Sequence, residues 1–309
     1  MELRQLRYFL RVVEHGSLTR AAAALAVAQP VLSRQIRDLE HALGVPLLAR
    51  NGRGMVLTEA GRRFLPRARA ITRDADLARE EVRSLRERPS GTVTVAMAPI
   101  VGAILWVPLL AEVQRGFPEI RLQVAEGYSG HVIEWLVHGK ADLGVIYQPD
   151  DSGAIRHELL IDERLYLVGV RGAPVFRDAS IPFAEVSRLR LILPTMAHAI
   201  RRKMEAVAAK RRLALDVALE VNAYPAIKTI VLAQRAFTVL PAAPVLEELR
   251  ARRFSIAEIT APTLSQKVVL ATSTHHPASL ATRAVYRLIK DLVEKLKNAG
   301  GWPARYPPG

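Results

Sequence analysis

The sequence predicts an N-terminal winged helix–turn–helix, a long linker helix, and an α/β region made of two subdomains. Two short helical segments lie about three residues apart within 17–43. After Leu57 apolar residues recur at heptad spacing, and from Gly91 short apolar strands alternate with helical segments. With 309 residues the chain is long enough for each unit to bury its own core.

The first 43 residues predict three short helices. Apolar residues recur at helical spacing over 3–13, and Gly16 ends that helix. Ser17 is a good N-cap for a second helix, whose alanines at 21–24 allow another helix to cross closely. The third helix has a polar, basic side opposite a buried stripe formed by Leu32, Ile36, Leu39 and Leu43.

Two helices joined by a short turn can place the second helix in the DNA major groove. The apolar arms around Asn51-Gly52-Arg53-Gly54 predict a β-hairpin, which after such a motif is a wing. Each feature alone favours a small helical domain with solvated arginines, but their order in one segment favours DNA binding. The predicted DNA-contacting residues are Thr19, Gln29, Pro30, Ser33, Arg34, Arg37, Arg50 and Arg53.

The charge balance favours a polyanionic partner. The chain has 44 Lys and Arg against 30 Asp and Glu, a net charge of +14, and residues 1–90 hold 17 Arg, no Lys and 10 acidic residues. The absence of cysteine excludes disulfides, zinc–thiolate sites and cysteine nucleophiles. No run approaches the roughly 20 apolar residues of a membrane span, and the N-terminus lacks a signal peptide. We therefore expect a cytoplasmic protein without a membrane partner.

A heptad seam predicts that the linker helix dimerises. Thr58 caps this helix, and the seam lacks a partner unless it pairs with a second copy. The alternative is a long helix packed on its own domain. A dimer implies a dyad-symmetric operator on double-stranded DNA. The predicted dimerisation residues are Phe64, Ala68, Ile71, Ala75, Ala78, Val82 and Leu85.

The order and spacing of several motifs resemble the LysR-type transcriptional regulators, and 126–131 with 142–145 resemble their nitrogen-assimilation branch. The resemblance implies a dimerising linker helix, an effector domain like periplasmic binding proteins, and a homodimer or homotetramer. Ala28 departs from the small hydroxyl residue that usually caps the recognition helix. The motifs are Phe9, Gly16-Ser17-Leu18-Thr19-Arg20-Ala21-Ala22, Gln29-Pro30-Val31-Leu32-Ser33-Arg34-Gln35-Ile36, Leu39-Glu40, Leu43-Gly44-Val45-Pro46-Leu47 and Leu57-Thr58-Glu59-Ala60-Gly61.

The region after Gly91 predicts two α/β subdomains with a ligand cleft between them. Ligands in open α/β sheets bind beyond the carboxyl ends of the strands, and helix N-termini there suit an anion, so we expect a small organic acid. Ile100 departs from the serine or threonine common in the family, removing a donor. The predicted effector-binding residues are Ile100, Val101, Ser129, Gly130, Tyr147, Thr195 and His198.

These patterns predict domain boundaries and partners. His198, Arg201 and Arg202 form a suggestive charged group, although solvated arginines are an equal alternative. The partners expected are operator DNA, the effector, a second copy and RNA polymerase, with no cofactor. The predicted units are a DNA-binding domain (1–58), a linker helix (59–88), a hinge (89–91), subdomain I (92–163 and 266–297), subdomain II (164–265) and a mobile tail (298–309).

Enzyme and transport functions are the alternatives. A solute-binding protein or a cleft enzyme would use the basic helices only for assembly. The missing export signal disfavours the first, and no phosphate-binding glycine loop or nucleophile elbow supports the second. The histidines show no metal-ligand spacing, so we expect no metal site. Because no catalytic motif is present, we also expect no enzymatic activity.

Overall fold

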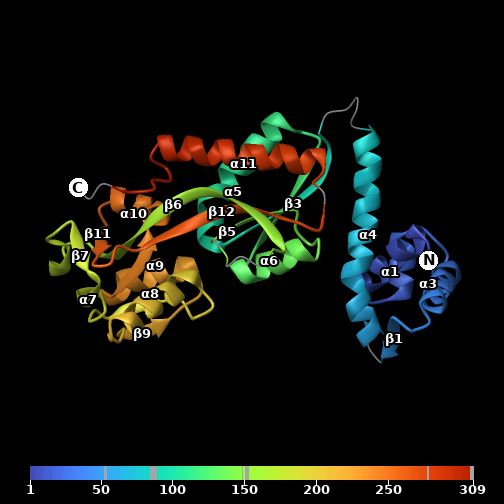
Figure 1. The fold of residues 1–309 in the computed structure, drawn as a ribbon, viewed down its shortest axis with the longest axis horizontal. Helices are drawn as coiled ribbons and strands as arrows, with labels where there is room; N and C mark the ends of the chain where they lie inside the picture. Colours follow the sequence, from blue (N-terminus) through green and yellow to red (C-terminus); the bar gives the residue numbers. More distant parts are fainter. Residues whose placement is uncertain (52–53, 84–88, 148, 150–152, 277, 307–309) are drawn as a thin grey trace.

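The computed structural model confirms the predicted three helices and hairpin at the N-terminus (Figure 1). It describes residues 1–309 except 52–53, 84–88, 148, 150–152, 277 and 307–309, and the side chains of 73–74 and 77–83 also lie outside the described set. The elements are α1 (Leu3–His15), α2 (Leu18–Ala24), α3 (Gln29–Leu43), β1 (Leu48–Asn51) and β2 (Gly54–Leu57).

Local sequence explains these elements. Gly16 ends α1 with a φ of 60°, in the left-handed region that glycine adopts without steric cost. The Ser17 side chain accepts a hydrogen bond from the Arg20 amide and caps α2. Leu6, Phe9 and the α3 stripe pack into one core. The three helices therefore bury a common apolar centre and leave the polar side of α3 outside.

The linker helix is α4 (Glu59–Arg83). Its first turns do not belong to the predicted dimer seam, because Phe64 and Ala68 pack within their own domain. Ala68 is fully buried in the core of the DNA-binding domain, and Phe64 contacts Phe9 with ring centroids 5.6 Å apart. These two residues pack on their own domain because the first turns of α4 cover α1. Ile71 is 40% exposed, while the side chains of Ala78 and Val82 and all of Leu85 lie outside the described residues.

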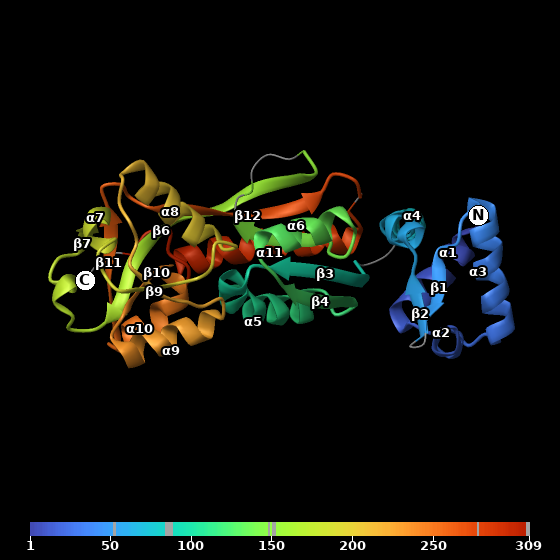
Figure 2. The same ribbon diagram turned by 90° about the horizontal axis from the view of Figure 1, so that it is seen from below.

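The remaining strands form one mixed sheet that runs through both subdomains (Figures 1 and 2). Its order is β4-β3-β5-β12-β6-β10-β8-β9, and β11 pairs with β6 and β7. The strands are β3 (Gly91–Met97), β4 (Ile120–Glu126), β5 (Leu143–Tyr147), β6 (Ile155–Val170), β7 (Ser180–Pro182), β8 (Leu191–Leu193), β9 (Val217–Glu220), β10 (Phe237–Pro241), β11 (Phe254–Thr260) and β12 (Ser265–Ser273).

Helices cover both faces of this sheet. In subdomain I, Val93 and Val95 of β3 face the helices α5 and α11, whereas Ala96 faces α6. The alternation follows from the two-residue side-chain period of a strand. The helices of this region are α5 (Pro99–Gly116), α6 (Ser129–Val137), α7 (Phe183–Val186), α8 (Ala199–Lys210), α9 (Tyr224–Gln234), α10 (Leu246–Arg250) and α11 (Leu280–Asn298), with 3₁₀ turns η1 (Pro174–Phe176) and η2 (Ala243–Val245).

Strand β6 belongs to both subdomains. Its first half, with β12, pairs in subdomain I, and its second half pairs antiparallel with β10 and β11 in subdomain II. The predicted crossing near residue 163 therefore falls inside one continuous strand of 16 residues. The sequence pattern locates only 164–170 of this strand, and it misses β7 and β11.

The predicted mobile tail is wrong for residues 299–306. Trp302 is fully buried in the core of subdomain I, and its indole Nε1 donates a 2.8 Å hydrogen bond to Glu163 Oε2. The composition is rich in glycine and proline, but one large aromatic side chain is enough to anchor the segment. Within the described part of the chain, no helix is long and apolar enough to span a membrane.

Candidate DNA and effector sites

The outer side of α3 carries most of the predicted DNA-contacting residues. Gln29, Pro30, Arg34 and Arg37 are exposed and Ser33 is half-buried. Pro30 lies in the first turn, where its missing N–H leaves no helix hydrogen bond broken. Ala28 provides no side-chain cap, as the sequence implied. The exposed first turns of α3 therefore present side chains of mixed polarity and positive charge.

Backbone contacts hold the wing against α3. Glu40 Oε1 accepts hydrogen bonds from the Leu47 and Leu48 amides at 2.7 and 2.9 Å. On its other strand, the Met55 amide donates to the Gly16 carbonyl at 2.9 Å. The wing is thus fixed to α3 and to the turn between α1 and α2. Arg50 on β1 is exposed, while Arg53 lies outside the described residues.

The first two arginines of α4 form ion pairs that, among the described residues, Arg34 and Arg37 of α3 lack. Arg62 and Arg63 pair with Glu59 on α4, at 3.1 and 3.2 Å. Arg34 and Arg37 form no ion pair with any residue that the structure describes. Their charges are therefore available to an external anion. Thr19, on α2, is exposed as well.

Two cavities lie where the subdomains meet. The larger, which we call the Lys203 cavity, has a volume of about 330 Å³. The smaller, the His198 pocket, measures about 10 Å³, which is room for one water molecule. Tyr147 lines the Lys203 cavity, and its ring centroid lies 6.0 Å from that of His198. The two cavities are therefore neighbours, separated by an aromatic contact.

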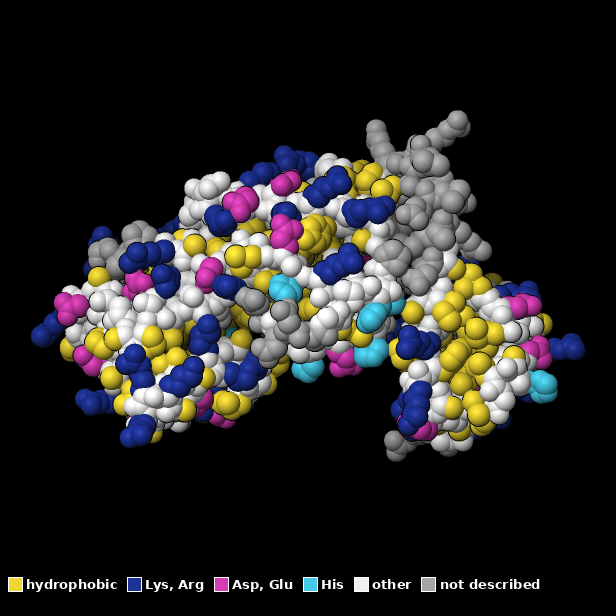
Figure 3. All heavy atoms as spheres, in the orientation of Figure 1, with side chains coloured by type: hydrophobic (Ala, Val, Ile, Leu, Met, Phe, Trp, Pro, Cys, Tyr) yellow, Lys and Arg dark blue, Asp and Glu magenta, His cyan; other side chains and the backbone are white. Residues whose placement is uncertain are grey.

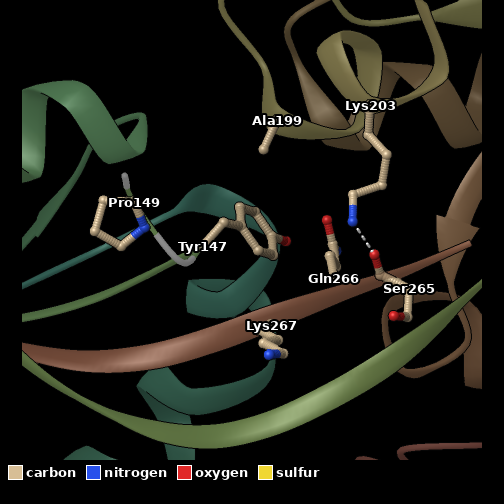
Figure 4. A pocket seen from close by; sticks show the side chains of 7 residues that line it. All are labelled: Tyr147, Pro149, Ala199, Lys203, Ser265, Gln266 and Lys267. Carbon is tan, nitrogen blue, oxygen red and sulfur yellow. Dashed lines mark hydrogen bonds between the residues drawn. The ribbon is translucent and has the colours of Figure 1, made fainter. Parts of the chain in front are cut away.

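The Lys203 cavity combines residues from both subdomains and from distant parts of the sequence (Figure 4). Lys203 extends from α8, and its ammonium donates to the Ser265 carbonyl at the start of β12. Lys267 lies two residues further along β12. Lys203 and Lys267 bring two positive charges to the cavity lining, which favours an anionic occupant. The lining residues are Tyr147, Pro149, Ala199, Lys203, Ser265, Gln266 and Lys267.

The His198 pocket is mainly apolar and nearly closed. Ile100, on α5 of subdomain I, is 4% exposed and packs into the core of subdomain II. Tyr128 contacts His198 edge-on, with ring centroids 5.9 Å apart, and its hydroxyl reaches the Asn222 carbonyl at 3.5 Å. Burial, with the nearby Arg202 charge, lowers the pKa of His198 to about 4. His198 is therefore neutral near pH 7 and adds no positive charge.

The structure separates the predicted effector-binding residues. Tyr147 lines the Lys203 cavity, and Ile100 and His198 line the His198 pocket. The side chain of Val101 is fully buried in the core of subdomain I and lines neither cavity. The Thr195 amide and hydroxyl both donate to Asn222 Oδ1 at 3.0 Å. Ser129 and Gly130 form the first turn of α6 and line neither cavity.

The charged group predicted near the cleft has another role. Arg201 is only 8% exposed, and its guanidinium donates to Glu205 and Glu220 at 2.8 and 2.7 Å. Arg201 therefore links α8 to β9. It is neither a free cation facing the cleft nor a solvated surface arginine. Arg202 donates to the carbonyls of 196 and 197. Pattern analysis missed Lys203, Gln266 and Lys267, because nothing in the sequence near them marks a site.

Among the described residues, no group of three or more histidine and acidic side chains is arranged to hold a metal ion. The buried carboxylate of Glu163 lies in contact with Gln266 and Trp302, which are both neutral. Its surroundings are those of a hydrogen-bond network.

Comparison with known families accounts for nearly the whole chain. Residues 3–62 match the bacterial regulatory helix–turn–helix proteins of the lysR family, and 86–294 match the LysR substrate binding domain. The nitrogen assimilation regulatory protein nac of Klebsiella aerogenes is 31% identical over 296 residues, which cover 96% of each chain. The regulator OxyR of Escherichia coli is 27% identical over 80% of this chain and 81% of its own length.

Solved structures show the same fold. A full-length OxyR variant from Pseudomonas aeruginosa has a TM-score of 0.78 at 21% identity, over 95% of this chain and 97% of its own. CbnR complexed with its target DNA has a TM-score of 0.66 at 23% identity, over 95% of this chain and all of its own. With two matched domains and relatives along its length, the chain belongs to the LysR family of DNA-binding transcriptional regulators, with an N-terminal helix–turn–helix and a C-terminal effector-binding domain.

Proposed function

We propose that α3 reads a dyad-symmetric operator and that Arg34 and Arg37 contact bases or phosphates there. The proposal rests on the two exposed guanidinium groups that are free of ion pairs among the described residues. The neighbouring Gln29 is placed to read a base edge, since an amide can bond both a donor and an acceptor on adenine. The wing, which carries Arg50, lies beside α3, where it can contact the sugar–phosphate backbone of the DNA.

Arg34→Ala is expected to weaken operator binding by 10- to 100-fold, because a base or phosphate contact of this kind contributes about 1–3 kcal/mol. Binding is measured by fluorescence anisotropy on the native upstream duplex and a scrambled duplex at fixed salt. Arg211→Ala, which removes the same charge from an exposed site on subdomain II, is the control and retains wild-type affinity. Equal affinities of the two variants for the operator would contradict the assignment.

A dimer through α4 supplies the second half-site reader. Hydrophobic side chains gather along the described part of α4 and beside it on one face of the N-terminal domain (Figure 3). Ile71 belongs to this stripe by its 40% exposure and seam position, one helix turn beyond the buried Ala68. An exposed stripe of this kind marks an association surface. We propose that a second copy covers it.

Ile71→Asp is expected to shift the protein from dimer toward monomer, because a charge would have to be buried in the seam. Sedimentation velocity at micromolar concentration measures the change. Arg69→Asp is the control: it lies two residues away at a position that is already charged, changes the net charge by more than Ile71→Asp does, and should leave the dimer intact. A dimer that survives Ile71→Asp at the wild-type dissociation constant would place the interface elsewhere.

The effector domains offer a second interface. Val124 on edge strand β4 is 49% exposed, and Leu219 on the opposite edge strand β9 is 39% exposed. Val107 on α5, beside β4, is 79% exposed. We propose that these edges meet between copies and join two dimers into a homotetramer. RNA polymerase is the further proposed partner, because an operator-bound regulator acts on transcription.

The Lys203 cavity is the proposed effector site, and a small organic acid is the proposed effector. The cavity is lined by two lysines and lies between the subdomains, so an anion there would contact both. Of the nearby carboxylates, Glu163 is buried beneath the cavity wall, and Asp162 stands opposite Lys267 in the register of β6 and β12. A ligand that bridges the subdomains would alter their relative orientation and hence the operator complex.

Lys203→Met is expected to abolish stabilisation by carboxylates, because it removes one of the two ammonium groups and keeps the aliphatic stem. A panel of small mono- and dicarboxylates is screened by thermal unfolding for those that raise the wild-type Tm. Lys210→Met, on the exposed last turn of the same helix, is the control and responds as the wild type does. An undiminished Tm increase in Lys203→Met would exclude this cavity.

A further inference from the structure

A buried carboxylate lies directly behind the wall of the Lys203 cavity. Glu163 on β6 is 2% exposed, and each of its oxygens accepts one hydrogen bond. Gln266 Nε2 donates to Oε1 at 2.8 Å, and Trp302 Nε1 donates to Oε2 at 2.8 Å. The carboxylate therefore connects a residue of the cavity wall to a residue of the C-terminal segment.

The C-terminal segment, residues 299–306, passes from subdomain I to subdomain II. It leaves α11 and places Trp302 in the core of subdomain I. Beyond Trp302, the Ala304 carbonyl accepts from the Arg164 amide at 2.9 Å, and the Tyr306 amide donates to the Tyr166 hydroxyl at 2.8 Å. Arg305 donates to Glu258 of β11 at 3.0 Å. The segment thus fastens the end of α11 to the second half of β6 and to subdomain II.

Glu163 also sets the orientation of the Gln266 amide. An ionised carboxylate only accepts hydrogen bonds, so the NH₂ group of Gln266 must face it and the carbonyl oxygen must face away. That oxygen, Oε1, and the Tyr147 hydroxyl are buried, and neither has a partner at full hydrogen-bond geometry among the described residues. The Gln266 side chain is nevertheless near enough to the Tyr147 hydroxyl to oppose the rise in its pKa. Both residues line the Lys203 cavity (Figure 4). The wall of the cavity therefore holds polar atoms that a ligand can satisfy.

We propose that Glu163 and Trp302 are positioning residues of the Lys203 cavity. Trp302 holds the Glu163 carboxylate, and the carboxylate fixes the Gln266 amide. A change at Gln266 in the cavity wall is therefore passed through Glu163 and Trp302 to the contacts between the C-terminal segment and subdomain II. The link to a ligand rests on the proposed effector role of the cavity, whereas the network itself does not.

The protonation state of Glu163 reports on this network. Burial, with the charge of Asp162 on the same strand, raises the pKa of Glu163 to about 7, while the donors Trp302 and Gln266 act to lower it. Tyr147, which faces it from β5, stays neutral because burial raises its pKa well above the usual value. Lys203 and Lys267 are the cations of the adjoining cavity. The carboxylate thus titrates near neutral pH, in contact with an indole.

Trp302 fluorescence tests the proposal in the full-length protein. The chain has three tryptophans, so Trp106→Phe with Trp135→Phe leaves Trp302 as the only one. Its emission is expected to change with a midpoint near pH 7, and Glu163→Gln abolishes the change. Gln266→Leu raises the midpoint because it removes a donor to the carboxylate. Asp162→Asn, the control at an exposed neighbour, keeps the transition and lowers its midpoint. A transition that survives Glu163→Gln, or a midpoint unmoved by Gln266→Leu, would overturn the network.

Hydrogen exchange tests the C-terminal attachment. Trp302→Phe keeps an aromatic ring but removes the N–H donor, so the exchange of the Tyr306 and Arg164 amides is expected to accelerate at least threefold. Trp135→Phe is the control and leaves these amides at wild-type rates. Unchanged exchange in Trp302→Phe would mean that Trp302 acts only by packing. Neither experiment uses an effector, so a negative result in both would leave the effector assignment of the cavity untouched. If instead Lys203→Met responded to carboxylates as the wild type does, the Glu163 network would still stand.

Discussion

Trp302→Ala is expected to lower the free energy of unfolding of the effector domain by about 4 kcal/mol. The substitution leaves a cavity where a fully buried indole packed, and large aromatic-to-alanine changes in cores cost about 3–5 kcal/mol. It also leaves one oxygen of the buried Glu163 without its donor. Urea unfolding followed by circular dichroism at pH 7.5 measures the loss.

Two variants separate the contributions to this loss. Trp302→Phe retains most of the packing and is expected to lose about half as much as the alanine variant. Tyr306→Ala removes a side chain near the end of the same segment but leaves the backbone hydrogen bond to Tyr166 in place, so it should lose less than either. Single substitutions typically change the free energy of unfolding by about 0.5–3 kcal/mol. If Trp302→Ala lowered it by less than about 1 kcal/mol, the segment would be dispensable for stability.

Gly61→Ala is expected to destabilise the DNA-binding domain by about 3 kcal/mol and to abolish operator binding at 37 °C, because overpacking against backbone cannot relax. A Cβ at Gly61 would lie 2.0 Å from the Leu47 carbonyl oxygen and 2.9 Å from its carbon. These atoms belong to the backbone that joins α3 to the wing, where the Leu47 carbonyl already accepts from the Thr58 amide. Relief of the clash must therefore move α4 or the wing.

Thermal unfolding and operator binding of Gly61→Ala are compared with those of Gly116→Ala. Gly116 ends α5 and has open space around the position of a Cβ, so the control should stay within 1 kcal/mol of wild type. Gly61→Ala is expected to show an early first transition, with the effector domain unfolding at its normal temperature. A single, unshifted transition would mean that the backbone accommodates the methyl group.

Local patterns were sufficient for the N-terminal half. The helices, the hairpin and the caps at Ser17 and Thr58 each depend on residues within one turn, so spacing alone located them. Heptad spacing located the linker helix as well but not its partner. It could not distinguish the turns that pack on α1, around Ala68, from the exposed position of Ile71.

Long-range contacts explain what the sequence did not predict. The charged run Asp162-Glu163-Arg164 interrupts an apolar pattern, so the pattern predicts a strand that begins only at 164, although Glu163 is buried by partners about 100 residues or more away. The Lys203 cavity brings together Tyr147, α8 and β12, which no motif connects. The ordered tail depends on one indole whose acceptor lies 139 residues earlier in the chain.

The continuity of β6 limits how the two subdomains can move. A strand of 16 residues that is hydrogen-bonded along both halves cannot be pulled apart at its centre without exposing unpaired backbone groups. It can, however, coil more or less tightly about its own axis, and β12 beside it has a register irregularity between Val268 and Val269 that eases such a change. A change in the twist of this pair would rotate one subdomain against the other.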